Sequence, residues 1–62
     1  MMYTIGMLNG FAWECAISNA IKRLSKKEKY SNYTIRENGN EVAEMLEILE
    51  IKFDENGEFV EV

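Results

Sequence analysis

The shortness of this chain, together with its single cysteine, constrains the fold more than any other feature. A domain of 62 residues buries only about 60% of the surface that its unfolded chain exposes, so its margin of stability is small. Cys15 has no second cysteine with which to form an internal disulfide, whereas small secreted domains usually depend on such bonds. We therefore expect a single domain, residues 1–62, that has one apolar core and functions in the reducing environment of the cytoplasm.

No segment of the sequence has the pattern of an export signal or a membrane span. The first 21 residues carry one charged side chain, Glu14, and lack the basic start of a signal peptide. Polar residues interrupt their apolar run well before the ~18 consecutive apolar residues that a membrane span requires. The sequence therefore predicts a soluble protein that makes no contact with a membrane.

Two segments have apolar residues at helical spacing. The apolar stripe of residues 11–27 consists of Trp13, Ile17, Ala20, Ile21 and Leu24. The stripe of residues 40–50 consists of Val42, Met45, Leu46 and Leu49. Steps of three and four residues place each set on one face of a helix. We expect helices at residues 11–27 and 40–50, with Asn40 as the N-cap of the second.

Strand signals surround these predicted helices. Residues 3–8 carry no charge and are rich in residue types that favour strands. Residues 33–37 begin with the same Tyr-Thr-Ile triplet as the N-terminal segment, and Asn-Gly follows soon after each triplet. We expect a strand in each segment. The similarity between them would fit a duplicated strand–helix unit, but only three residues match, so coincidence is the simpler interpretation.

The C-terminal segment predicts a hairpin, because Asn56-Gly57 is the strongest short-range signal for one. A two-residue turn would pair Phe53 with Val60, Ile51 with Val62 and Lys52 with Glu61. A three-residue turn with a bulge would pair Phe53 with Phe59 instead. We favour the two-residue turn because it gathers four apolar side chains on one face of the hairpin.

The predicted order of elements is β-α-β-α-β-β. It describes a small α+β domain in which two helices pack on a mostly antiparallel sheet that ends in the C-terminal hairpin. A winged helix is the alternative, with the hairpin as its wing. A winged helix needs a third helix, and the sequence has no pattern for one, so we favour the α+β arrangement.

Few residues in the chain are suited to catalysis or metal binding. There is no histidine, the side chain best suited to proton transfer near neutral pH, and Cys15 therefore lacks its usual activating base. The segment from Asp54 to Glu58 has the composition of part of a calcium loop, but Lys52 occupies a position where an EF-hand requires an oxygen ligand. We expect a protein that is not an enzyme and needs neither a cofactor nor a metal.

The charged residues are divided by position along the chain. Residues 37–62 hold nine acidic residues and one basic residue, a net charge of −8, whereas residues 1–36 hold six basic and two acidic residues, a net charge of +4. The basic cluster consists of Lys22, Arg23, Lys26, Lys27 and Lys29. Such a cluster could contact phosphates, but nucleic-acid binders usually have a basic excess, and this chain has a net charge of −4. The simpler interpretation is that these residues complement the dipole of the first helix.

The acidic residues form the stronger candidate for a binding surface. The predicted partner-binding residues are Glu41, Glu44, Glu47, Glu50, Asp54, Glu55, Glu58 and Phe59. The glutamates of the second helix recur every three residues, about 4.5 Å along the helix axis, which is close to the ~3.4 Å between phosphates of one DNA strand. Phe59 would add an aromatic anchor to this surface, unless it packs beneath the N-terminal strand.

These observations favour an interaction protein that binds a basic surface of a protein partner through its acidic C-terminal half. In size and charge the chain resembles the small acidic proteins that bacteriophages and mobile elements direct against host nucleases and polymerases, among them anti-CRISPR and anti-restriction proteins. This likeness is one of composition, and it implies an inhibitor that occupies a nucleic-acid-binding site. One alternative is a nucleic-acid-binding regulator that uses residues 22–29. Another is a dimerisation or subunit module whose uncharged N-terminal strand pairs with a partner.

Overall fold

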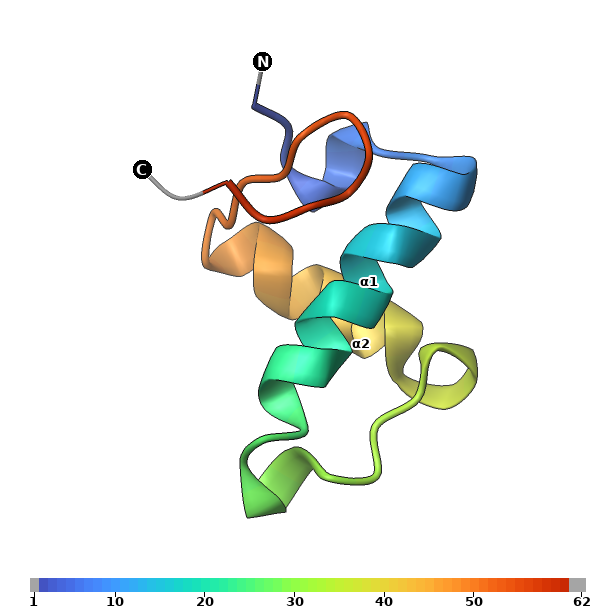
Figure 1. Cartoon of the computed structure of the whole chain (residues 1–62), viewed down its shortest axis with the longest axis vertical. Coiled ribbons are helices and arrows are strands. Elements are labelled where there is room, and N and C mark those ends of the chain that lie inside the picture. The colour runs from blue at the N-terminus through green and yellow to red at the C-terminus, as the bar shows by residue number, and fades with distance from the viewer. Residues whose placement is uncertain (1, 61–62) are drawn as a thin grey trace.

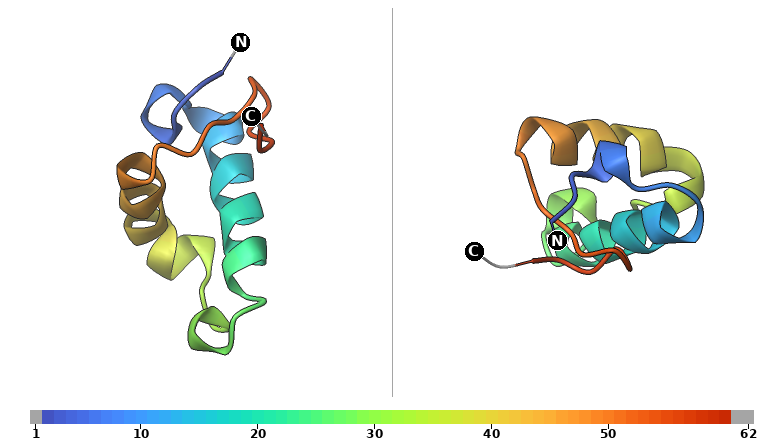
Figure 2. Two further views of the ribbon diagram at one scale, coloured as in Figure 1. Left: turned by 90° about the vertical axis from the view of Figure 1, so that its left-hand side faces the viewer. Right: turned by 90° about the horizontal axis from the view of Figure 1, so that it is seen from above.

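The computed structural model describes residues 2–60, which form two α-helices with short irregular segments before, between and after them (Figure 1). The element order is η1 (Ile5–Met7), α1 (Gly10–Leu24), η2 (Glu28–Tyr30) and α2 (Ile35–Ile48), where η denotes a 3₁₀-helix. The two α-helices form two layers, and the N-terminal segment lies between them at one end (Figure 2). The predicted α+β class is wrong, because residues 2–60 contain isolated β-bridges and no sheet.

Helix α1 follows the apolar stripe that the sequence predicted. Its buried residues are Ala16, Ile17, Ala20 and Ile21. The helix begins at Gly10 after the extended Asn9, and it ends at Leu24, three residues before the predicted end. Lys22 and Arg23 lie in the last turn, where positive charge complements the negative end of the helix dipole. The prediction of a helix over this part of the chain is therefore confirmed.

Helix α2 begins earlier than predicted because Thr34 caps its N-terminus. The Thr34 hydroxyl accepts a hydrogen bond from the backbone N–H of Glu37 (3.2 Å), and the side chain of Asn38 accepts one from the backbone N–H of Thr34 (3.0 Å). These reciprocal bonds satisfy two backbone donors at the start of the helix, as in a capping box. The predicted strand at residues 33–37 is therefore wrong, and Asn40 lies inside the helix rather than at its N-cap.

The C-terminus of α2 is closed by a Schellman motif. The backbone N–H of Ile51 bonds to the carbonyl oxygen of Leu46 (3.1 Å), and that of Glu50 bonds to the carbonyl oxygen of Glu47 (3.1 Å). The motif requires a residue in the left-handed conformation, and Glu50 occupies that position with φ of 56°. The helix therefore ends at Ile48, and the chain turns back toward α1.

The N-terminal segment makes one bridge instead of the predicted strand at residues 3–8. Tyr3 exchanges two backbone hydrogen bonds of 2.8 Å with Phe53, after which the chain turns into η1. The carboxylate of Glu47 accepts a hydrogen bond from the backbone N–H of Gly6 (2.9 Å), and Ile5 is buried in the core. A long-range contact with α2 therefore holds this segment in a turn that its strand-forming residues do not favour on their own.

The C-terminal segment pairs in the register with the longer turn, so the favoured two-residue turn is wrong. Phe53 bridges Phe59, and the backbone N–H of Asp54 bonds to the carbonyl oxygen of Glu58 (2.8 Å). One carboxylate oxygen of Asp54 accepts hydrogen bonds from the backbone N–H groups of Asn56 (2.8 Å) and Glu58 (3.0 Å), which stabilises the wider loop. The pairs that the favoured register assigned to Glu61 and Val62 lie outside the described residues.

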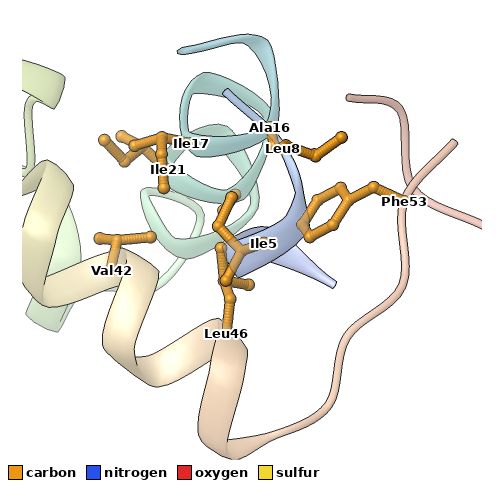
Figure 3. Close-up of a cluster of buried hydrophobic side chains, with 9 residues drawn as sticks. Ile5, Leu8, Ala16, Ile17, Ile21, Val42, Leu46 and Phe53 are labelled. Carbon is orange, nitrogen blue, oxygen red and sulfur yellow. The ribbon is translucent and has the colours of Figure 1, made fainter. Parts of the chain in front are cut away.

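The core lies where side chains from the irregular segments enter the space between the helices. Its buried members are Ile5, Leu8, Ala16, Ile17, Ala20, Ile21, Val42, Leu46 and Phe53. Ile5 of η1 and Phe53 of the C-terminal segment point toward the side chains of both helices (Figure 3). Phe53 is fully buried, and burial of a side chain of this size stabilises the fold by roughly 1.5–3 kcal/mol. The N-terminal and C-terminal segments, which have strand-forming sequences, therefore cover the core between the two helices.

Candidate protein-binding surface

The outward face of α2 carries a narrow stripe of exposed residues, which we call the α2 stripe. It consists of Glu37, Glu41, Glu44 and Ile48, and all four are exposed. Their spacing of four, three and four residues places them within about 60° of one another around the helix axis. The buried residues Gly39, Val42 and Leu46 lie on the opposite side of α2. The stripe is therefore directed away from α1 and extends about 16 Å along the helix.

Ile48 is the unusual member of the α2 stripe. It is 81% exposed, the largest exposed fraction among the large apolar residues of the described chain. Glu41 and Glu44 lie seven and four residues before it and so share its face of the helix. A single exposed apolar side chain is common on protein surfaces, and Phe11 is 80% exposed, so the significance of Ile48 lies in its place on the same helix face as two carboxylates.

Glu41 is held in place by a neighbouring tyrosine. The Tyr33 hydroxyl donates a hydrogen bond to the Glu41 carboxylate (3.2 Å), and the Tyr30 ring packs edge-on against the Tyr33 ring at 5.1 Å between centroids. Desolvation raises the pKa of the Tyr33 hydroxyl, and the hydrogen bond to Glu41 and the charges of Glu41 and Tyr30 raise it further. The hydroxyl therefore stays protonated and keeps donating to Glu41 throughout the neutral range.

Two of the four predicted helical glutamates lie off the α2 stripe. Glu47 lies on the flank of α2 that faces η1, where its carboxylate bonds to Gly6. Glu50 lies beyond the end of the helix in the left-handed conformation. The even row predicted from three-residue steps is therefore divided, and only Glu41 and Glu44 remain on the outward face.

The acidic residues of the C-terminal loop lie beside α1 and do not extend the α2 stripe. Figure 2 shows the C-terminal segment running from the end of α2 across to α1. The side-chain amide of Asn19 donates a hydrogen bond to the carbonyl oxygen of Gly57 (3.0 Å), and Glu58 borders a shallow depression that also includes Lys22. Asp54 is half-buried and occupied with its loop hydrogen bonds, whereas Glu55 is exposed at the turn. The structure thus separates the predicted acidic surface into two parts.

Phe59 is packed against its own domain. Its ring lies 5.1 Å from the Phe53 ring between centroids, and the Arg23 guanidinium lies 4.0 Å from its centroid. Phe59 is half-buried, and a cation–π contact of this kind stabilises its position by roughly 0.5–1 kcal/mol. One part of the ring therefore packs against Phe53 and Arg23, and the ring does not project into solvent as a free anchor.

The predicted basic cluster gathers at the end of the molecule where α1 ends. Lys22, Arg23, Lys26, Lys27 and Lys29 are all exposed. Arg23 contacts Phe59, and the Lys29 ammonium lies 5.4 Å from the centroid of the Tyr30 ring. Two of the five cations are thus engaged with aromatic rings of the same chain.

A groove between the two helix ends was not expected from the sequence. It has a volume of about 350 Å³ and is lined by Ala20, Arg23, Leu24, Met45, Leu46, Leu49, Glu50, Ile51, Lys52, Phe59 and Val60. These residues come from α1, α2 and two stretches of the C-terminal segment, so no local pattern could have indicated that they meet. By contrast, helical periodicity could have placed Ile48 on the face of Glu41 and Glu44.

Comparison with protein-family models, curated proteins and solved structures finds no match to this chain. Within residues 2–60, no helix combines the length and apolar character needed to cross a membrane. In the same part of the chain, no three His, Cys, Asp or Glu side chains come together in a group that could hold a metal ion. The geometry of the surface therefore provides the basis for a functional proposal.

Proposed function

We propose that this chain is a non-enzymatic interaction protein that binds a basic surface of a protein partner through the α2 stripe. The single observation that carries the proposal is Ile48, which is 81% exposed on the same helix face as Glu41 and Glu44. Burial of an isoleucine side chain by a partner would contribute roughly 1.5–3 kcal/mol to binding, and the fold of the described residues does not use that contribution.

The partner implied by this stripe has an apolar pocket bordered by lysine or arginine residues. Ile48 lies at one end of the α2 stripe, after Glu41 and Glu44, so a partner that covers the stripe would bury an apolar side chain next to two carboxylates. The carboxylates would direct the approach of a basic partner and exclude acidic ones. The most specific form of the proposal is an inhibitor that occupies a basic, nucleic-acid-binding groove.

The row of like charges on the α2 stripe is the basis of that specific form. Glu37, Glu41 and Glu44 follow one another at about 6 Å and 4.5 Å along the helix, a wider spacing than the ~3.4 Å between successive phosphates of one DNA strand. A groove that neutralises several phosphates could therefore accept this row of charges. Capture from a cell extract, described next, would identify the partner.

Capture from a cell extract with matched variants tests the proposal. The immobilised proteins are the wild type, Glu41→Lys/Glu44→Lys, Ile48→Gln, and Glu55→Lys as a charge-reversal control outside the α2 stripe. We expect a basic protein that the wild type and Glu55→Lys retain and that the other two variants lose. Retention by all four proteins, or loss from the Glu55→Lys control alone, would contradict the assignment of the α2 stripe.

The identified partner then allows a direct test of inhibition. Its binding to labelled nucleic acid is measured while the wild-type protein is added, and we expect displacement by the wild type and not by Ile48→Gln. A ternary complex of partner, nucleic acid and this protein would exclude the inhibitor form while leaving partner binding intact.

A further inference from the structure

The groove between the helix ends has an apolar floor and an edge that carries both signs of charge. Leu24, Met45, Ile51 and Val60 are among its apolar lining residues. Its volume of about 350 Å³ is within the usual size range of binding sites for small molecules or side chains. Such a concave apolar surface gains stability when another group covers it.

Charged residues flank this floor. Arg23 and Lys52 provide two positive charges and Glu50 one negative charge. Lys52 is half-buried, and Glu50 is placed at the groove by its left-handed backbone conformation at the end of α2. A surface that fits the groove therefore combines an apolar side chain with a carboxylate that faces Arg23 and Lys52. It must also accept the carboxylate of Glu50.

The groove itself has such a surface at its edge. Leu49 is 61% exposed there, and Glu50 follows it directly. A protruding leucine beside a hollow, with a carboxylate beside two cations, is complementary to a copy of itself turned by 180°. Isologous interfaces of twofold dimers require this kind of self-complementarity, because the same patch is used by both subunits.

We propose that the groove is the interface at which two copies of this chain associate about a twofold axis. Leu49 of each copy enters the groove of the other, and Glu50 of each copy faces Lys52 and Arg23 of the other. The charge complementarity between the two edges favours a second copy over an apolar ligand without charge.

The proposed dimer is compatible with the size of the chain and with partner binding by the α2 stripe. A specific interface of standard size covers roughly 600–1,000 Å² of each subunit, out of an accessible surface of 4632 Å², so the proposed interface also buries surface around the groove. Leu49 lies about 100° around the helix axis from Ile48, so the groove and the α2 stripe face different directions. The dimer therefore does not depend on the proposed function, and either can fail without the other.

Sedimentation velocity from micromolar to millimolar concentration, at physiological salt, tests the proposal. We expect the wild type to form a concentration-dependent dimer, and we expect Leu49→Gln to raise the dissociation constant by about tenfold or more. Ile48→Gln is the matched control, because it makes the same kind of change at the adjacent residue and should leave the dissociation constant unchanged. Thermal melts confirm that each variant is folded.

Reversal of the charges at Glu50 and Lys52 distinguishes a role at the dimer interface from a role within the fold of one copy. Glu50→Lys and Lys52→Glu should each weaken the dimer by about tenfold, since each places like charges opposite one another. An equimolar mixture of the two variants should restore association. One variant has lysine at positions 50 and 52 and the other has glutamate at both, so each contact between these positions in the mixed dimer again joins opposite charges. A wild type that stays monomeric at millimolar concentration, an unchanged Leu49→Gln variant or a mixture that does not associate would each overturn the proposal.

Discussion

Replacing Gly57 with alanine would place a methyl group against the backbone of α1. A Cβ built at this residue meets the carbonyl oxygen of Ala12 at less than contact distance, and it lies 2.8 Å from the backbone nitrogen of Ala16 and 3.0 Å from the Cβ of Cys15. Backbone atoms of a helix cannot move aside as the end of a flexible side chain can. Gly57 also has φ of 85°, a conformation that residues with a Cβ rarely adopt.

The expected loss of stability has two parts. Adoption of the left-handed conformation by a residue with a side chain costs about 1–2 kcal/mol, and overpacking against α1 costs about 1–3 kcal/mol more. A domain of 62 residues has a free energy of unfolding of only about 3–9 kcal/mol. Gly57→Ala should therefore cost about 2–5 kcal/mol, roughly a fifth of the stability or more, and it should leave a substantial fraction of the protein unfolded if the total is near the lower end.

Gly10→Ala is the matched control, because Gly10 also has a positive φ of 56° but no atom lies within 4 Å of its Cβ position. It should lose only the backbone part of the free energy, about 1–2 kcal/mol. Urea denaturation followed by the fluorescence of Trp13, which packs against the core, measures both variants. Equal destabilisation of the two proteins would refute the inference that Gly57 packs directly on α1.

Three further substitutions test other contacts of the fold. Glu50→Gly relieves the strain of the left-handed backbone conformation at the end of α2. We therefore expect it to raise the free energy of unfolding by about 1 kcal/mol and the melting temperature by about 4–8 °C. An unchanged melting temperature at low protein concentration would count against the Schellman geometry. Thr34→Ala removes the N-cap of α2 and should cost about 0.5–2 kcal/mol, whereas Thr34→Ser should retain most of the stability in the same denaturation assay. Glu41→Gln removes a charge that raises the pKa of Tyr33, so an absorbance titration of the phenols should show a lower Tyr33 midpoint than in the wild type. The raised pKa favours protonated Tyr33 in the folded state. The contribution of this residue to the free energy of unfolding is therefore fully present below the unfolded pKa of about 10, and it is lost as the pH rises through the folded pKa. An increase in the free energy of unfolding of the wild type over this pH range would contradict the expected direction.

The helices were the most predictable part of this fold. The apolar stripe of α1 identified its buried face, because a helix forms its hydrogen bonds within four residues and its pattern is therefore local. The start of α2 was missed although Thr34-Ile35-Arg36-Glu37 has the spacing of a capping box. The β-forming character of Tyr33, Thr34 and Ile35 competes with that capping signal, and in the structure Thr34 acts as the N-cap.

The candidate surface was only partly predictable, for a related reason. Glu41 and Glu44 were correctly placed on a helix, and the periodicity of that helix would also have indicated Ile48. Glu47 was assigned to the same row, yet its carboxylate bonds to Gly6, 41 residues away in sequence. The groove could not have been predicted, because its lining residues come from segments that meet only in the folded chain.

The sequence by itself determined the existence of the two helices, the presence of a C-terminal turn and the positions of the charged residues along the chain, whereas it did not determine the start of α2 or the register of that turn. The tertiary structure decided that the β-prone segments form no sheet and that the acidic residues face in different directions. The physical reason is that a strand obtains its hydrogen bonds from distant residues, so its formation depends on what else those residues must do. Phe53 pairs with Tyr3 and Phe59 through single bridges, and its ring is fully buried in the core between the helices. Burial of that ring, and the loops needed to bring it there, left each neighbouring segment with one paired residue rather than a strand.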